Sequence, residues 1–147
     1  MRRRIVLFTL IAASTILGLG GPATAESATL VAYMTGAQER PNPGDPDGIG
    51  RAVVFINDDT NTICVATQFT GIDMPLTGYH IHLAPPGAPG PIVVPFNTPT
   101  SQSDYQCRVV ENEALLDNIA ANPHQYYINL HNTPFPGGAL RGQLQHA

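Results

Sequence analysis

The sequence predicts an all-β fold, an antiparallel, Greek-key-like β-sandwich with one short helix. Short extended runs recur along the chain, turn residues (mainly Gly, Pro, Asn and Asp) separate them, and a single Ala- and Leu-rich segment interrupts the series. Closely spaced strands with turns between them favour an antiparallel sandwich or barrel over an α/β fold, in which strands alternate with helices.

The first 25 residues have the pattern of a signal peptide. Residues 2–4 are arginines, residues 5–19 are mostly apolar, and residues 23–25 form the small-x-small cleavage site Ala-Thr-Ala. The apolar part is shorter than the roughly 20 residues of a membrane-spanning helix. We therefore expect a signal peptide over 1–25, one domain over 26–147, a secreted or periplasmic location, and no membrane span after cleavage.

Three strands are expected next, in ATLVAYMTG, GRAVVFIND and TICVATQF. The NDDTN turn between the last two indicates a hairpin, because Asn and Asp tolerate left-handed and turn conformations. Alternation along these two strands places six apolar residues on inner faces, namely Ala52, Val54, Ile56, Ile63, Val65 and Phe69.

Four further extended runs follow: GYHIHL, PIVVPF, QYYINL and ALRGQLQ. Between the second and third of these, ENEALLDNIAANP has early glutamates, a helical spacing of Leu and Ile, and a final proline. This pattern predicts one short helix from about Glu111 to Ala121, on a crossover between strands.

Net charge and motifs narrow the function classes. Without the signal peptide, four arginines remain against eleven carboxylates, a net charge of about −7. Nucleic acid and anionic lipid would require a basic face, so we expect neither as a partner. No serine lies in a G-x-S-x-G motif and no carboxylate pair stands out. The sequence therefore leans against an enzyme without deciding the question.

The two cysteines, Cys64 and Cys107, are expected to form a disulfide, because export places them in an oxidising compartment. By the chain-entropy model, closing the loop of 42 intervening residues would stabilise the fold by about 3–4 kcal/mol. The alternative is one buried thiol on a strand and one thiol in a loop, which the spacing alone leaves open.

Histidines form the candidate site. Alternate side chains of a strand share a face, so His80 and His82 project together from GYHIHL. In YYINLHN the same alternation sets His131 opposite the apolar residues. If both apolar faces point into the core and the two strands are neighbours, the three imidazoles can share one metal ion.

Imidazole without a nearby thiolate or carboxylate predicts copper first and zinc second. His124, after the predicted helix, and Arg141, near the end of the chain, are candidate accessory residues. The Pro- and Gly-rich loop after His82 is expected to act as a rigid wall over the site. Histidine pairs without metal are the structural alternative.

Three motifs carry a family resemblance: MTGAQERPNP, TGYHIHLAPPGAPGPIV and YYINLHNTPFPGGALRGQL. In this order they closely resemble the chordin-type (CHRD) domain, over roughly residues 28–145, in the single-domain exported form found in bacteria. This chain has Ala84 where the family usually has glycine and Asn132 where it usually has threonine. The resemblance implies an extracellular β-sandwich module and identifies a fold better than an activity.

A weaker resemblance is to copper-zinc superoxide dismutase, which implies a similar β-sandwich architecture. His80, His82, His131 and Arg141 follow the order of an H-x-H strand, a later strand ending in histidine, and an arginine near the end of the chain. Between His82 and His131 the only histidine is His124, fewer ligands than a full copper-zinc site needs. A copper-only redox enzyme is thus the least favoured function.

The rival to a metal site is a metal-free interaction module. In that interpretation, the loop after His82 and Tyr79 contact an extracellular protein or glycan, since an aromatic ring beside a rigid loop is a suitable recognition surface.

Overall fold

The computed structural model describes residues 27–147, so the predicted signal peptide lies outside the described residues. The domain is all-β with one short helix, as predicted. Its strands are β1 (Ala28–Thr35), β2 (Ile49–Asn57), β3 (Thr62–Thr70), β4 (Leu76–Leu83), β5 (Ile92–Pro95), β6 (Ser103–Val109), β7 (Tyr126–Asn132), β8 (Leu140–Gln143) and β9 (Gln145–His146). The helix α1 spans Glu113–Ala121, and the 3-10 turns are η1 (Gly36–Gln38), η2 (Asp58–Thr60) and η3 (Pro123–Gln125).

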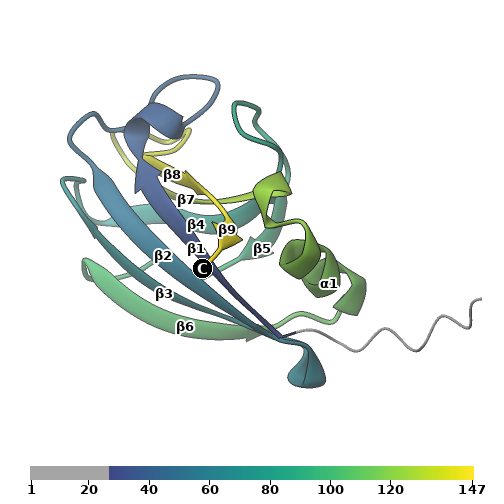
Figure 1. Ribbon diagram of the computed structural model, residues 1–147. Helices are drawn as coiled ribbons and strands as arrows, with labels where there is room; N and C mark the ends of the chain where they lie inside the picture. Colours follow the sequence, from purple (N-terminus) through teal and green to yellow (C-terminus); the bar gives the residue numbers. More distant parts are fainter. Residues whose placement is uncertain (1–26) are drawn as a thin grey trace, which may run out of the picture.

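The strands form one curled antiparallel sheet in the order β5-β4-β7-β8-β1-β2-β3-β6, with β9 paired to β1. The sheet closes on itself as a sandwich: β1, β2, β3 and β6 lie side by side, and β4, β5 and β7 cross behind them (Figure 1). The two layers meet at β8 and β1, which share the single residue pair Thr35–Arg141. The chain crosses between the layers after β3, after β5 and after β6, and it returns after β8 to pair β9 with β1.

The core lies between the two layers and is built by alternation. All six inward positions predicted on β2 and β3 are buried. From the opposite layer, Tyr79 and Ile81 of β4 and Ile128 and Leu130 of β7 are fully buried against them. The hydroxyls of Tyr79 and Thr67 form a hydrogen bond across the sandwich. This packing fixes which faces of β4 and β7 point away from the core.

The turns and the helix follow their predicted chemistry. Asn61 ends the β2–β3 turn in the left-handed region (φ 48°), and Asn57 Oδ1 accepts from the Thr60 N–H. The side chain of Asn112 caps α1 by accepting from Leu115 N–H, so the helix begins two residues later than predicted. Within residues 27–147, no helix has the length and hydropathy to cross a membrane.

Strand β6 was not predicted. Its sequence, SDYQCRV, has no buried apolar face, because β6 is an edge strand whose residues are all exposed or only half-buried. Alternation of apolar residues therefore gives no signal there. The predicted strand ALRGQLQ is also divided, since β8 pairs with β7 and β9 pairs with β1.

Cys64 and Cys107 are joined by a disulfide between β3 and β6. The two residues are directly opposite in the register, so the bond joins the edge strand β6 covalently to β3. Cys64 is half-buried and Cys107 is exposed, on the outer face of this layer. The bond therefore acts by chain connectivity more than by core packing.

Replacing both cysteines with alanine is expected to lower the free energy of unfolding by about 3–4 kcal/mol, because the unfolded chain regains the freedom of the closed loop. Urea denaturation of the variant measures this loss, and the wild-type protein under reductant is the matched control. A loss below about 1 kcal/mol would contradict a stabilising disulfide.

Candidate metal centre

Strands β4 and β7 are neighbours, so the adjacency on which the predicted site depends is confirmed. In the antiparallel register, His80 lies opposite Asn129, His82 opposite Tyr127, and His131 opposite Gly78. Because the apolar faces of both strands point into the core, these side chains share the other face of the sheet. They form a polar layer that loops cover.

Gly78 lets two of the imidazoles approach each other. A Cβ atom at this position would lie 2.8 Å from Cε1 of His80 and 3.1 Å from Cδ2 of His131. Both contacts are at or below the closest approach that a side chain tolerates. With glycine there, the ring centroids of His80 and His131 are 5.2 Å apart and their planes are inclined by 63°.

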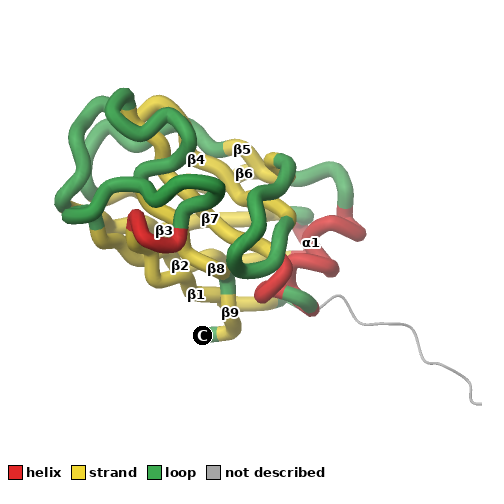
Figure 2. Tube along the Cα trace, turned by 90° about the horizontal axis from the view of Figure 1, so that it is seen from above, coloured by secondary structure: helices red, strands yellow, loops and turns green. Residues whose placement is uncertain are grey.

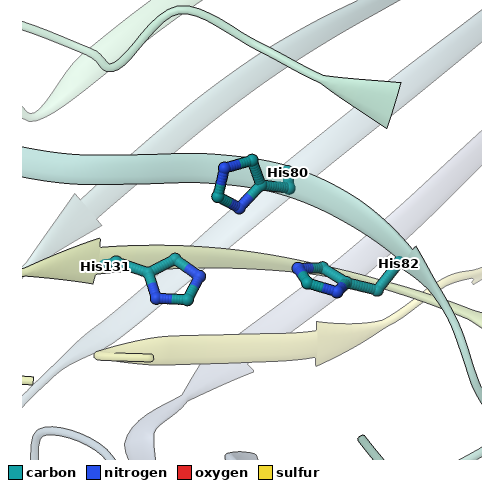
Figure 3. A group of neighbouring side chains, drawn as sticks. All are labelled: His80, His82 and His131. Carbon is teal, nitrogen blue, oxygen red and sulfur yellow. The ribbon is translucent and has the colours of Figure 1, made fainter. Parts of the chain in front are cut away.

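The three histidines form one compact cluster. One ring nitrogen from each of His80, His82 and His131 lies within 4.8 Å of the other two. Figure 3 shows a nitrogen of each ring turned toward the space between the rings. Metal–imidazole bonds of about 2.0–2.1 Å set ligand nitrogens about 3.4 Å apart in a tetrahedral site. Small rotations of the side chains would bring the rings to that separation, so the cluster can hold a metal ion.

Backbone carbonyls fix the tautomers of two imidazoles. His82 Nδ1 is 2.8 Å from the Gly90 carbonyl oxygen, and His131 Nδ1 is 3.0 Å from that of Pro136. A carbonyl only accepts, so both Nδ1 atoms carry the proton and both Nε2 atoms keep a lone pair. These two Nε2 atoms and Nδ1 of His80 are buried without a hydrogen-bond partner among the described residues. Such outer-shell hydrogen bonds are typical of metal-binding histidines.

The environment favours neutral imidazoles. Burial, followed by the charges of His131 and His82, lowers the pKa of His80 to about 4. Burial also lowers the pKa of His82 and of His131. At neutral pH all three imidazoles are therefore uncharged. Each has one ring nitrogen with a free lone pair, which is the state that binds a metal.

The loop after β4 is held over the cluster by β8. Arg141 donates from Nη1 to the Ala88 carbonyl (2.8 Å) and from Nη2 to the Pro85 carbonyl (3.1 Å), and Gln143 Nε2 donates to the Ala84 carbonyl (2.8 Å). Figure 2 shows loops gathered at the end of the strands away from α1 and a further loop beside α1. The loop after His82 is thus fastened at several points, in agreement with the rigid wall expected from its prolines.

Arg141 itself is 1 % exposed. Its guanidinium carbon lies 3.5 Å from the ring centroid of Tyr127, whose ring also stacks on His82 with centroids 4.7 Å apart. The guanidinium is therefore enclosed by the covering loop and an aromatic ring, away from the surface. Arg141 is a buried clamp that links β8, the covering loop and the aromatic neighbour of His82.

Other predicted residues lie away from the cluster. His124 is exposed on η3, and its carbonyl accepts from Gln143 Nε2. His146 is exposed on β9. Tyr79, expected in one interpretation to contact a partner, is fully buried in the core, so that part of the prediction is wrong. Because side chains alternate along β4, Tyr79 points into the core while the histidines of this strand point into the polar layer.

Two residues of the polar layer, Asn129 and Glu39, were not predicted as site residues, although alternation along YYINLHN places Asn129 on the same face as His131. Asn129 Nδ2 donates to Glu39 Oε1 (3.3 Å), and both side chains are buried. Gly138 packs on the Glu39 carboxyl so closely that a Cβ there would lie 2.2 Å from its Cδ. Asn129 belongs to the motif Y-x-N-x-H and Glu39 to the motif E-x-P. Neither periodicity nor metal-ligand spacing identifies these two residues as part of a site.

Burial raises the pKa of Glu39 to about 7, although Asn129 and Arg141 act in the opposite direction. The folded protein therefore binds more protons at Glu39 than the unfolded chain, whose value is 4.5. The raised pKa means that protonation of Glu39 stabilises the folded state. This contribution is fully present below pH 4.5 and is lost as pH rises to about 7.

Glu39→Gln keeps the shape and removes this titration. We expect the stability of the variant relative to wild type to increase as pH rises from about 4.5 to about 7 and then to level off. Urea denaturation at several pH values, with chelator present, measures the difference, and histidine titration cancels because both proteins share it. A difference that does not change with pH would contradict a desolvated carboxyl.

Comparison with known proteins identifies a family. The family model for the CHRD domain matches residues 30–144, most of the chain and all the strands that carry the polar layer. No curated protein and no solved structure matches the chain. The matched span contains the strand–loop–strand arrangement described above, and the chain belongs to the CHRD domain family.

Proposed function

We propose that this protein is exported from the cell and binds a transition metal through His80, His82 and His131. The observation that carries the proposal is the convergence of three buried ring nitrogens without hydrogen-bond partners among the described residues. Leaving one buried polar atom unsatisfied costs about 1–3 kcal/mol. A bound ion would satisfy all three at once, so a ligand is the simplest reason for the arrangement.

The donor set supports copper first and zinc second. Within residues 27–147, the cluster has three imidazoles and neither a thiolate nor a carboxylate. Imidazole suits copper and zinc, and at a given nitrogen site copper(II) binds more tightly than zinc. The net negative charge of the exported chain favours the approach of cations. A secreted or periplasmic location remains part of the proposal and rests on the pattern of the first 25 residues.

A metal-free interaction module is the second candidate function, and a different surface favours it. Tyr79 is buried, but Tyr33, Phe55 and Tyr105 are exposed large side chains on the layer of β1, β2, β3 and β6. Exposed aromatic rings are common in recognition surfaces for proteins and glycans. This surface lies on the layer opposite the histidine cluster, so the two functions are separable by mutation.

The superoxide dismutase-like interpretation receives less support from the site. It requires an arginine that guides an anion to the metal. Here Arg141 is buried, and its guanidinium already donates to two loop carbonyls and to Gln143 Oε1. The arginine is therefore committed to holding the loop, and we propose binding rather than catalysis.

Isothermal titration with a competing chelator tests the proposal. We expect one copper(II) or zinc ion per chain, with a dissociation constant below about 10 μM, which corresponds to roughly 7 kcal/mol. His82→Ala should abolish this binding, because it removes a buried nitrogen that no neighbour replaces.

The matched control is His124→Ala, since His124 is exposed outside the cluster. It should bind metal as wild type does. Binding weaker than about 10 μM by wild type, or equal binding by the His82→Ala variant, would contradict the proposal and leave the histidines structural.

A further inference from the structure

A fourth buried atom without a partner lies beside the histidines. Asn129 is 2 % exposed, and its Oδ1 has no hydrogen-bond partner among the described residues. It stands directly opposite His80 in the β4–β7 register and two residues before His131 on the same face of β7. The side chain of Asn129 therefore lies on the same face of the sheet as the three rings.

The carboxamide of Asn129 is turned so that its oxygen faces the histidines. Its Nδ2 donates to Glu39 Oε1, so the amide nitrogen lies on the Glu39 side and the amide oxygen lies on the other side. The side chain of Asn129 also lies close enough to the rings of His80 and His82 to interact with both. The oxygen is thus within reach of the space where the ring nitrogens meet.

We infer that Asn129 Oδ1 is a fourth donor to the metal, which makes the site three nitrogens and one oxygen, and that Glu39 positions it. This inference rests on the proposed function. A carboxamide oxygen is a hard donor, so it stabilises copper(II) and zinc but adds little for copper(I), which prefers soft ligands. Asn129 is therefore the residue that determines selectivity for the divalent ion.

Glu39 contributes through Asn129 and touches no ring. Its carboxyl group is held by the close approach of Gly138 and by the turn η1, where Glu39 N–H donates to the Gly36 carbonyl (3.0 Å). By accepting from Nδ2, Glu39 prevents the amide from turning its nitrogen toward the metal.

Asn129→Leu tests the inference, because leucine has a similar volume and no oxygen. We expect its affinity for copper(II) and zinc to fall by about tenfold or more, while its affinity for copper(I) stays within about threefold of wild type. The electron paramagnetic resonance spectrum of copper(II) should also change. Asn129→Asp combined with Glu39→Gln keeps an oxygen at position 129 and restores an N–H between the two side chains, so this variant should not lose copper(II) affinity.

The outcomes separate the two claims. No metal binding by wild type overturns the proposed function and this inference with it. Wild-type affinities and an unchanged copper(II) spectrum in Asn129→Leu overturn the inference alone. A similar loss of copper(I) and copper(II) affinity would also overturn it, because that result indicates a structural role. Circular dichroism checks folding, and Asn129→Ala carries the same test if the leucine variant does not fold.

Discussion

Alternation of side chains along two neighbouring strands is the constraint on which this structure depends. Because Tyr79, Ile81, Ile128 and Leu130 fill the core, the residues between them must lie on the opposite face. Burial of four large apolar side chains contributes about 1.5–3 kcal/mol for each, so a shift of register by one residue would lose the core. The hydrophobic packing thereby fixes the histidines in one cluster.

A cluster of imidazoles on an outer face would ordinarily be solvated, and the loops prevent this. Arg141, Gln143 and the Nδ1 atoms of His82 and His131 all bond to carbonyls of the two covering loops. The same bonds that close the loops also set the histidine tautomers. The ordering of the two loops and the tautomers of the histidines therefore have one physical cause. Backbone carbonyls of the proline-rich loops have no strand partner and accept hydrogen bonds from these side chains instead.

Sequence reasoning reached the fold and the three histidines because both depend on period-two alternation. It placed seven of the strands near their observed positions and α1 to within two residues. It missed β6 because an exposed edge strand shows no apolar alternation. It also missed Glu39, which the fold brings against Asn129 from 90 positions away in the sequence. Such contacts are set by tertiary packing, which local patterns do not encode.

Buried atoms without partners distinguish the centre from an ordinary hydrogen-bonded network. A metal-free network would pair its members, since buried polar groups are almost always satisfied. Here Arg141 and Gln143 each make several hydrogen bonds, whereas the atoms that face one another across the centre have no partner among the described residues. The account therefore predicts an ion at the point where these atoms converge.

Anomalous diffraction from crystals of the copper- or zinc-loaded protein tests this most directly. The account predicts one anomalous peak within about 2.2 Å of His80 Nδ1, His82 Nε2 and His131 Nε2. A metal bound only at His124 or His146, or no peak between the three rings, would contradict it.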